Sequence, residues 1–165
     1  MKGQCLIMEI ERKFLIDKFP DNLPLKEESV MYQGYISVMP TVRIRKKISS
    51  KGSSYKLTIK SSGEMFRHEV EFDISEEKYN ELQEVFCPNP IIKLKKNYIL
   101  PDGKILECNL VDEGSNTEFM YAEIEFDSVG EAENYSLPHF LGKEVTFDNS
   151  YKMNNYWKRT RIENE

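Results

Sequence analysis

Charged side chains recur at every second position through most of this chain, and this alternation limits the possible fold more than any other feature. The first such segment, MEIERKFL, places Glu9, Glu11 and Lys13 on one parity and Ile10 and Phe14 on the other. Successive side chains of an extended strand point to opposite faces, so the three charges form one row. The alternation therefore predicts strands with one charged face and one apolar face.

Eight segments of this kind, separated by turn residues, predict a mainly β (α+β) fold. Gly and Pro mark the breaks, for example in PDG at 101–103. Short strands at near-regular spacing are typical of an antiparallel meander that can close into a barrel. The expected strands cover residues 8–16, 30–38, 41–49, 53–61, 66–74, 91–100, 104–111 and 121–128.

Few helices are expected. The segment SEEKYNELQEVF begins with Ser75 as the N-cap, and Pro88 ends it. Shorter helices are expected near residues 130–135 and 150–162. The apolar side of the first helix is expected to consist of Tyr79, Leu82, Val85 and Phe86.

Length and charge predict one domain that does not bind nucleic acid. With 165 residues, of which 39% are hydrophobic, the chain fits a single domain over residues 1–165, in which residues 1–7 are a candidate N-terminal extension. The net charge of -5 argues against a nucleic-acid partner, because affinity for a phosphate backbone comes from clustered Lys and Arg with little opposing charge. An anionic ligand would have to be bound locally.

Cysteine usage and the lack of a long apolar run predict a soluble, cytoplasmic protein. Cys5, Cys87 and Cys108 are an odd number at no metal-ligand spacing, so neither a disulfide framework nor a zinc site is expected. No apolar run approaches the roughly 18 residues that a membrane-spanning helix needs. We therefore expect reduced thiols and no membrane partner. The chain is also expected to be a monomer or homodimer.

The charged rows allow two interpretations. They are either the solvated face of amphipathic strands or the wall of an internal cavity, with the apolar parity turned outward. Two features favour the cavity. The polar positions are almost all Glu, Lys or Arg, and charges of one sign lie about 7 Å apart on one strand, where a solvated face would intersperse the signs. A polyanion between the basic rows, with divalent cations on the acidic rows, would satisfy this grouping.

The same rows resemble those of a known family. EIERK at 9–13 is similar to the ExExK signature of the CYTH domain, the triphosphate tunnel metalloenzyme superfamily. The similarity continues in family order and covers residues 8 to about 157. A lone ExExK is a weak signal, whereas an ordered set of motifs is specific. The further motifs are YQGYI, VRIRK, LTIKSSG, RHEVEF, EIEF and GKEVTFDNSYKMNNYW.

The resemblance implies an eight-stranded antiparallel β-barrel tunnel with a few flanking helices. It also implies hydrolysis of a triphosphate, foremost inorganic tripolyphosphate to diphosphate and phosphate, with Mg²⁺ or Mn²⁺ as cofactor. The implied substrate-binding residues are Lys13, Arg43, Arg45, Lys60, Arg67, Lys93 and Lys95. The implied metal ligands are Glu9, Glu11, Glu107, Glu123 and Glu125. The implied catalytic residues are Glu11, Lys60, Glu69, Glu71 and Tyr35.

Other functions stay open within and outside this enzyme class. The alternatives are a class IV-type adenylyl cyclase, a thiamine triphosphatase, and a non-catalytic polyphosphate- or nucleotide-binding module. Rich phosphate-binding chemistry without an obvious base-reading pocket favours the inorganic substrate. Both acidic pairs, Glu9/Glu11 and Glu123/Glu125, favour an enzyme, because a pure anion binder gains nothing from carboxylates in its site.

Several positions leave their roles open. Lys93-x-Lys95 stands where many short bacterial relatives carry Lys-x-Arg, and Glu107 stands where Asp is frequent, so substrate preference is in doubt. Tyr35 either reaches the tunnel or packs in the core. Tyr151 and Asn155 either close the tunnel or belong to a helix that only packs.

Overall fold

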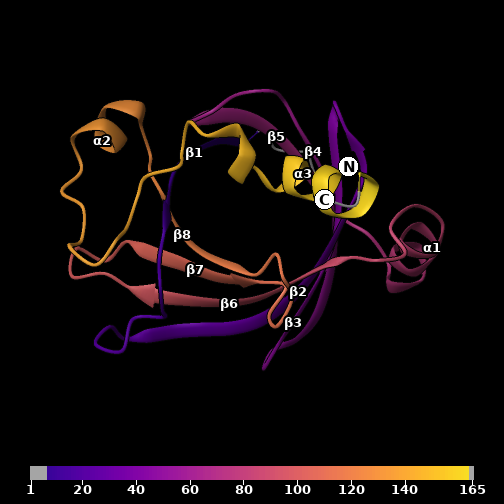
Figure 1. Cartoon of the computed structure of the whole chain (residues 1–165), viewed down its shortest axis with the longest axis horizontal. Helices are drawn as coiled ribbons and strands as arrows, with labels where there is room; N and C mark the ends of the chain where they lie inside the picture. The colour runs from indigo at the N-terminus through magenta and orange to yellow at the C-terminus, as the bar shows by residue number, and fades with distance from the viewer. Residues whose placement is uncertain (1–6, 164–165) are drawn as a thin grey trace.

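The computed structural model describes residues 7–163 as one closed antiparallel β-barrel with short helices outside it (Figure 1). Residues 1–6 of the expected extension, including Cys5, lie outside the described residues. Within residues 7–163, no helix has the length and apolar character to cross a membrane. The strands are β1 (Ile7–Leu15), β2 (Leu25–Val38), β3 (Thr41–Ser49), β4 (Gly52–Lys60), β5 (Phe66–Asp73), β6 (Ile91–Ile99), β7 (Ile105–Val111) and β8 (Phe119–Glu125).

The strand order is β1-β5-β4-β3-β2-β6-β7-β8, which confirms the eight-stranded barrel. The expectation of one continuous meander is wrong. Strands β2 to β5 and β6 to β8 form two meanders, and β1 lies between β5 and β8 instead of pairing with β2. β2 also begins at Leu25, earlier than expected, because the polar stretch LKEES hides its alternation.

Strand β1 changes partners along its length, and a late segment of the chain completes its edge. It pairs with β5 only as far as Ile10. Beyond that point the backbone N–H of Lys13 donates to Thr146 Oγ1 at 2.9 Å, and the N–H of Val145 donates to the Lys13 carbonyl at 2.8 Å. Residues near 145 therefore seal the barrel beside the ExExK strand and fix the position of Lys13.

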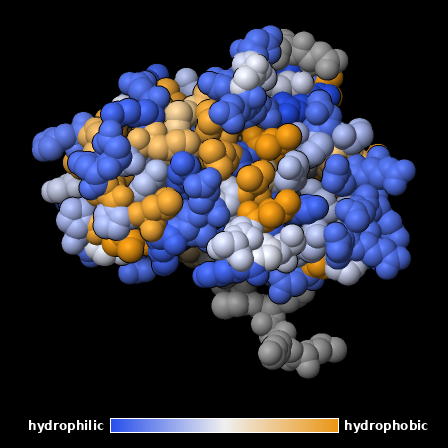
Figure 2. All heavy atoms as spheres, turned by 90° about the horizontal axis from the view of Figure 1, so that it is seen from below, coloured by the Kyte–Doolittle hydropathy of each residue, from blue (hydrophilic) through white to orange (hydrophobic). Residues whose placement is uncertain are grey.

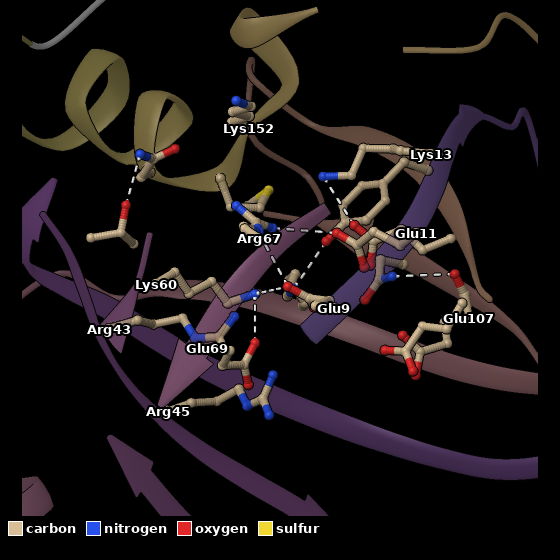
Figure 3. A pocket seen from close by; sticks show the side chains of 18 of the residues that line it. Glu9, Glu11, Lys13, Arg43, Arg45, Lys60, Arg67, Glu69, Glu107 and Lys152 are labelled. Atoms are coloured by element: carbon tan, nitrogen blue, oxygen red, sulfur yellow. Dashed lines mark hydrogen bonds and ion pairs between the residues drawn. The ribbon is translucent and has the colours of Figure 1, made fainter. Parts of the chain in front are cut away.

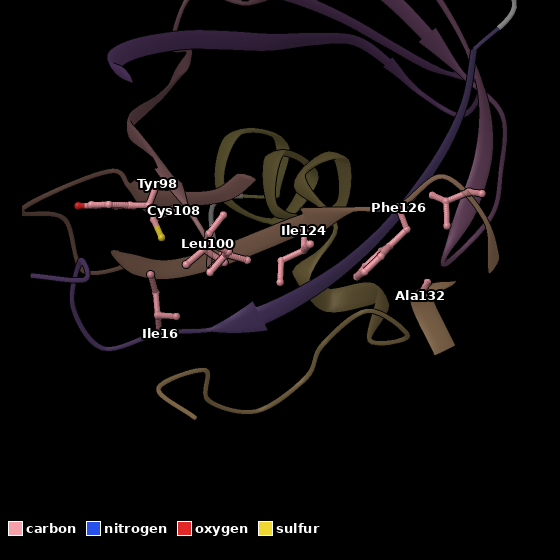
Figure 4. Packing of buried hydrophobic residues seen from close by; sticks show 10 residues of the cluster. Ile16, Tyr98, Leu100, Cys108, Ile124, Phe126 and Ala132 are labelled. Carbon is pink, nitrogen blue, oxygen red and sulfur yellow. The ribbon is translucent and has the colours of Figure 1, made fainter. Parts of the chain in front are cut away.

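The apolar parity of the strands faces outward and forms a core under α2 (Val129–Asn134), as expected (Figure 4). Ile124 and Cys108 are fully buried there, and Ile10 and Phe126 nearly so. Each large apolar side chain buried in this way stabilises the fold by roughly 1.5–3 kcal/mol. Because this layer lies outside the barrel, the interior is left for the charged parity.

Helix α1 (Glu76–Phe86) begins as expected. Ser75 Oγ accepts a hydrogen bond from the Lys78 N–H at 3.1 Å, which confirms the N-cap. The expected apolar side is only partly correct. Tyr79 is buried, but Val85 and Phe86 are 69% and 53% exposed. The helix lies at one end of the molecule, opposite α2 (Figure 1), and Tyr79 is its one buried residue.

The residue after α1 explains a glycine in the middle of β2. A Cβ atom at Gly34 would lie 2.3 Å from Cys87 Cβ and 2.6 Å from its Sγ. Cys87 is fully buried, so it has no room to move aside. Gly34 therefore lets the end of α1 pack directly on the barrel.

The expected C-terminal helix is three short pieces: η1 (Asn149–Tyr151), α3 (Met153–Trp157) and the π-helical turn η2 (Lys158–Ile162). The break occurs at Lys152, whose backbone is extended with φ -70° and ψ 133°. Arg161 anchors the last piece through two hydrogen bonds to the Asp112 carboxylate, at 2.7 and 3.0 Å. Met153 and Trp157 are buried against the barrel.

Part of the outward apolar layer stays uncovered. Ile59 on β4 and Ile92 on β6 are 40% and 45% exposed. Seen from below, hydrophobic side chains gather in patches between hydrophilic ones (Figure 2). Helices and loops therefore cover the barrel wall only in part.

Candidate active site

The barrel interior contains a cavity of about 240 Å³ with a highly charged lining (Figure 3). All of the site residues expected from the sequence line this one cavity, so the rows face inward and the solvated-face interpretation is wrong. They are Glu9, Glu11, Lys13, Tyr35, Arg43, Arg45, Lys60, Arg67, Glu69, Glu71, Lys93, Lys95, Glu107, Glu123 and Glu125.

Strand register brings opposite and like charges together across the wall. Residues directly opposite each other on neighbouring strands point to the same face. Lys13 lies opposite Glu123, whereas Glu11 lies opposite Glu125. The register therefore builds both an ion pair and a concentration of carboxylates.

The concentrated carboxylates are those of Glu9, Glu11 and Glu125, which each offer an oxygen within 4.8 Å of the other two. Burial, with the negative charges of Glu123 and Glu9 beside it, raises the pKa of Glu11 to about 8. Burial and the nearby Glu107 and Glu9 raise the pKa of Glu125 to about 7. Like charges this close are costly without a counter-ion. Carboxylate oxygens are ligands that Mg²⁺ and Mn²⁺ prefer, so this trio fits a divalent cation.

Glu9 differs from its two neighbours because two cations contact one oxygen of its carboxylate, whereas Arg67 reaches Glu11 at 3.3 Å. Its Oε2 lies 2.8 Å from Lys60 Nζ and 3.1 Å from Arg67 Nε. Burial alone would raise the pKa of Glu9, but the charges of Lys60 and Arg67 outweigh burial and lower it to about 2. Glu9 therefore stays ionised and links the trio to the lysine and arginine side chains of the cavity, which we call the basic wall (Figure 3).

The other two predicted metal ligands lie in ion pairs outside the trio. Glu123 Oε1 is 3.0 Å from Lys13 Nζ, and Glu107 Oε1 is 2.9 Å from Lys95 Nζ. Burial would raise the pKa of Glu123, but Lys13 and Lys93 lower it. Of the five predicted ligands, the structure thus gathers three and pairs two with lysines.

Glu71 lies beside Arg43 and Arg45, the two arginines that β3 contributes to the basic wall. Its Oε2 accepts a hydrogen bond from Thr58 Oγ1 at 2.9 Å and lies 3.8 and 3.9 Å from guanidinium nitrogens of Arg43 and Arg45. Burial would raise the pKa of Glu71, but the Thr58 hydrogen bond and the charge of Arg45 lower it. Glu71 is therefore a weak base that holds the two arginines side by side.

Tyr35 both reaches the cavity and packs in the core, the two roles that the sequence left open. It lines the cavity, and its ring packs on Trp157 with the centroids 6.0 Å apart. The Tyr35 hydroxyl accepts a hydrogen bond from Gln33 Nε2 at 3.1 Å. Burial raises the pKa of Tyr35, so its hydroxyl stays protonated and can donate a hydrogen bond to an anion in the cavity.

The C-terminal segment closes one end of the cavity, but it does so with Lys152 and Asn154 and not with the expected Tyr151 and Asn155. Lys152 Nζ donates to the Gly63 carbonyl at 2.6 Å, and Asn154 Nδ2 donates to Thr41 Oγ1 at 3.1 Å. Lys152 and Asn154 both line the cavity. Asn155 instead donates to the carbonyl of Asn149 at 2.8 Å, away from it.

Sequence reasoning missed six lining residues. Three of them continue a charged row, because Thr41 shares the parity of Arg43, Asn109 that of Glu107 and Tyr121 that of Glu123. Extending the period of two would have found all three. The C-terminal residues depend on a backbone turn that no periodicity reports. The missed residues are Thr41, Asn109, Tyr121, Lys152, Met153 and Asn154.

Comparisons with known proteins agree with this geometry. No family model matches the chain. The chain is 34% identical over 148 residues to an inorganic triphosphatase of Nitrosomonas europaea, covering 87% of this chain and 93% of that protein. A crystal structure of an inorganic triphosphatase is 29% identical with a TM-score of 0.64, over 93% of this chain and 96% of the other. A conserved hypothetical protein from Pyrococcus furiosus is 27% identical with a TM-score of 0.53, over 76% and 82%.

Proposed function

Because the chain belongs to the CYTH, or triphosphate tunnel metalloenzyme, superfamily, we propose that it hydrolyses inorganic tripolyphosphate to diphosphate and phosphate. One observation carries the proposal. A basic wall and a trio of carboxylates share one cavity. A linear polyanion can meet the wall while divalent cations meet the trio.

The basic wall would bind the phosphates. Arg43 and Arg45 present planar forks that can each grip two phosphate oxygens, whereas Lys60 acts as a compact charge. All three already face carboxylates, so a bound polyanion would exchange one set of ion pairs for another. Fixed cations of this kind stabilise the charge that spreads over the transferred phosphoryl group.

Glu9, Glu11 and Glu125 would hold Mg²⁺ or Mn²⁺. When bound, the cation would neutralise phosphate oxygens and lower the pKa of water. The three carboxylates suit this task because two of them have raised pKa values that a cation would bring down.

Hydrolysis forms a bond between a water oxygen and the terminal phosphorus and breaks the bond from that phosphorus to the bridging oxygen. Diphosphate leaves with the bridging oxygen, and the water proton passes to a base. Glu71 is poorly suited, since its pKa is lowered. We assign proton acceptance to Glu69, which lines the same cavity, lies 3.2 Å from Lys60 and stands outside the carboxylate trio.

Tyr35 would orient the substrate by donating a hydrogen bond from its hydroxyl to a phosphate oxygen at the end of the cavity that the C-terminal segment closes.

We also propose a cytoplasmic location and a monomer or homodimer. The buried, unpaired thiols of Cys87 and Cys108 suit a reducing compartment.

Phosphate release tests the proposal. Tripolyphosphate, ATP and thiamine triphosphate are compared side by side with Mg²⁺, Mn²⁺ or EDTA. We expect tripolyphosphate to be hydrolysed fastest and EDTA to abolish release. Equal or faster turnover of an organic triphosphate, or cyclic AMP formed from ATP, would reassign the substrate.

Two site variants with matched surface controls complete the test. Glu11→Gln and Lys60→Ala should fold and lose most activity, whereas Glu113→Gln and Lys51→Ala, at exposed turns, should keep it. Calorimetric binding of tripolyphosphate without release of phosphate would instead identify a non-catalytic binding module.

A further inference from the structure

A second chamber lies at the end of the barrel where β1 begins and β8 ends. This chamber, the vestibule, has a volume of about 710 Å³. Away from the inner cavity it is lined by side chains that include Lys26, Glu27, Asn97, Lys104, Phe126 and Asp127. Met153 and Asn154 line the other end of the inner cavity, and the pocket beside that end, lined by residues that include Lys152, has a volume of only about 20 Å³. The vestibule therefore offers a linear substrate more room than this pocket.

Among the described residues, the boundary between the two chambers is entirely acidic. The residues that line both are Glu9, Glu69, Glu107 and Glu125, which we call the collar. None of the eight basic residues that line the inner cavity within residues 7–163 lines the vestibule. In the direction of the vestibule, the positive charge that attracts phosphates therefore ends at the collar.

Acidic side chains outnumber basic ones in the vestibule because the collar belongs to it; beyond the collar the two signs are equal in number. The vestibule adds Glu27 and Asp127, against Lys26 and Lys104. Lys104 forms an ion pair with Glu131, and Glu27 forms one with Lys47; neither partner lines the vestibule. Cations bound by the carboxylate trio would offset the collar, but Asp127 is not part of that trio.

We propose that the collar and vestibule set the length of the chain that is hydrolysed, by repelling a fourth phosphate. The basic inner cavity, with a volume of about 240 Å³, would hold the three phosphates of the proposed substrate, and a longer chain that extends into the vestibule would place its next phosphate beside acidic side chains. Asp127 is then a specificity-determining residue that contributes nothing to the hydrolysis itself. This inference rests on the proposed hydrolysis of tripolyphosphate.

The test compares linear tetrapolyphosphate with tripolyphosphate in the wild type, in Asp127→Lys and in Glu28→Lys. Glu28 lies next to Glu27 on β2 but outside the vestibule, so both variants change the net charge equally. We expect Asp127→Lys to raise the ratio of kcat/KM for tetrapolyphosphate over tripolyphosphate about three- to tenfold. Glu28→Lys should leave this ratio unchanged, and 0.5 M KCl should reduce the effect. The ratio is compared only after circular dichroism shows that both variants have the wild-type fold, so that an unchanged ratio reports on charge and not on a loss of structure.

Three outcomes would overturn the inference: an unchanged ratio in Asp127→Lys, an equal rise in Glu28→Lys, or wild-type enzyme that hydrolyses both substrates equally well. Failure of the proposed function looks different, because tripolyphosphate itself would then release no phosphate. In that case the affinities for both chains, measured by calorimetry with Mg²⁺, decide the inference through the same ratio.

Discussion

Replacing Glu11 with glutamine should separate stability from activity, because the Glu11 carboxyl is held in an unfavourable environment. Its pKa is about 8 in the folded protein against 4.5 for an ordinary glutamate. A carboxyl with a raised pKa binds its proton more tightly in the folded state. The free energy of unfolding therefore falls as the pH rises from about 4.5 to about 8. The Glu11→Gln variant would lack this dependence while keeping the shape of the side chain.

The size of the effect follows from the two pKa values. Between pH 5.5 and pH 8.5, wild-type protein in EDTA should lose about 3 kcal/mol relative to Glu11→Gln. For a chain of this length, such a loss corresponds to about 6–12 °C in the midpoint of thermal unfolding. Glu125 adds a further fall, since its pKa is about 7, but it does so in both proteins.

Thermal unfolding in EDTA, followed across this pH range by circular dichroism, measures the difference. Glu11→Gln should become the more stable protein at high pH and yet be inactive towards tripolyphosphate. Adding Mg²⁺ should flatten the wild-type curve, because a bound cation favours the ionised carboxylate. The surface variant Glu113→Gln should follow the wild type. Parallel curves for wild type and Glu11→Gln in EDTA would refute the reasoning.

Three further results should follow from the structure. Lys60→Ala should lower kcat on tripolyphosphate by about 100-fold or more while circular dichroism shows an unchanged fold, because it removes a fixed cation from a water-filled cavity; loss of fold would show that Lys60 is structural. Gly34→Ala should cost about 1–3 kcal/mol in urea unfolding, since its methyl group would overlap Cys87; a neutral substitution would mean that α1 shifts freely. Arg161→Met should cost about 3 kcal/mol by leaving the Asp112 carboxylate without its cation, although Tyr156 still donates a hydrogen bond to it, and Arg161→Met with Asp112→Asn should recover part of this loss; no recovery would place the effect elsewhere.

Most of the barrel could be predicted from local pattern because each strand carries its own signal. The alternation in MEIERKFL and in its counterparts states which side chains share a face. The cap at Ser75 is equally local, since it needs only its own side chain and the N–H of Lys78. The predictions that failed concern contacts between residues far apart in the sequence. No local signal says that β1 pairs with β5 and β8, or that α1 leaves Val85 and Phe86 exposed.

The site divides in the same way. Residue type and parity selected most of the side chains that line the cavity, since the interior of a barrel receives one parity from every strand. They were not enough to sort the carboxylates. Glu11 and Glu123 look alike in the sequence, yet Lys13 pairs with Glu123 while Glu11 faces Glu125.

By itself, the sequence determined that the strands are amphipathic, that their polar parity is charged, and that the charges of one sign are grouped. These properties depend on neighbours one or two residues apart, so they survive without knowledge of the fold. Only the tertiary structure decided which face is inside, which three carboxylates come within 4.8 Å, and where the basic charge ends. The physical reason is that Coulomb energies and burial depend on distance in space, and barrel closure sets those distances between residues far apart in the chain.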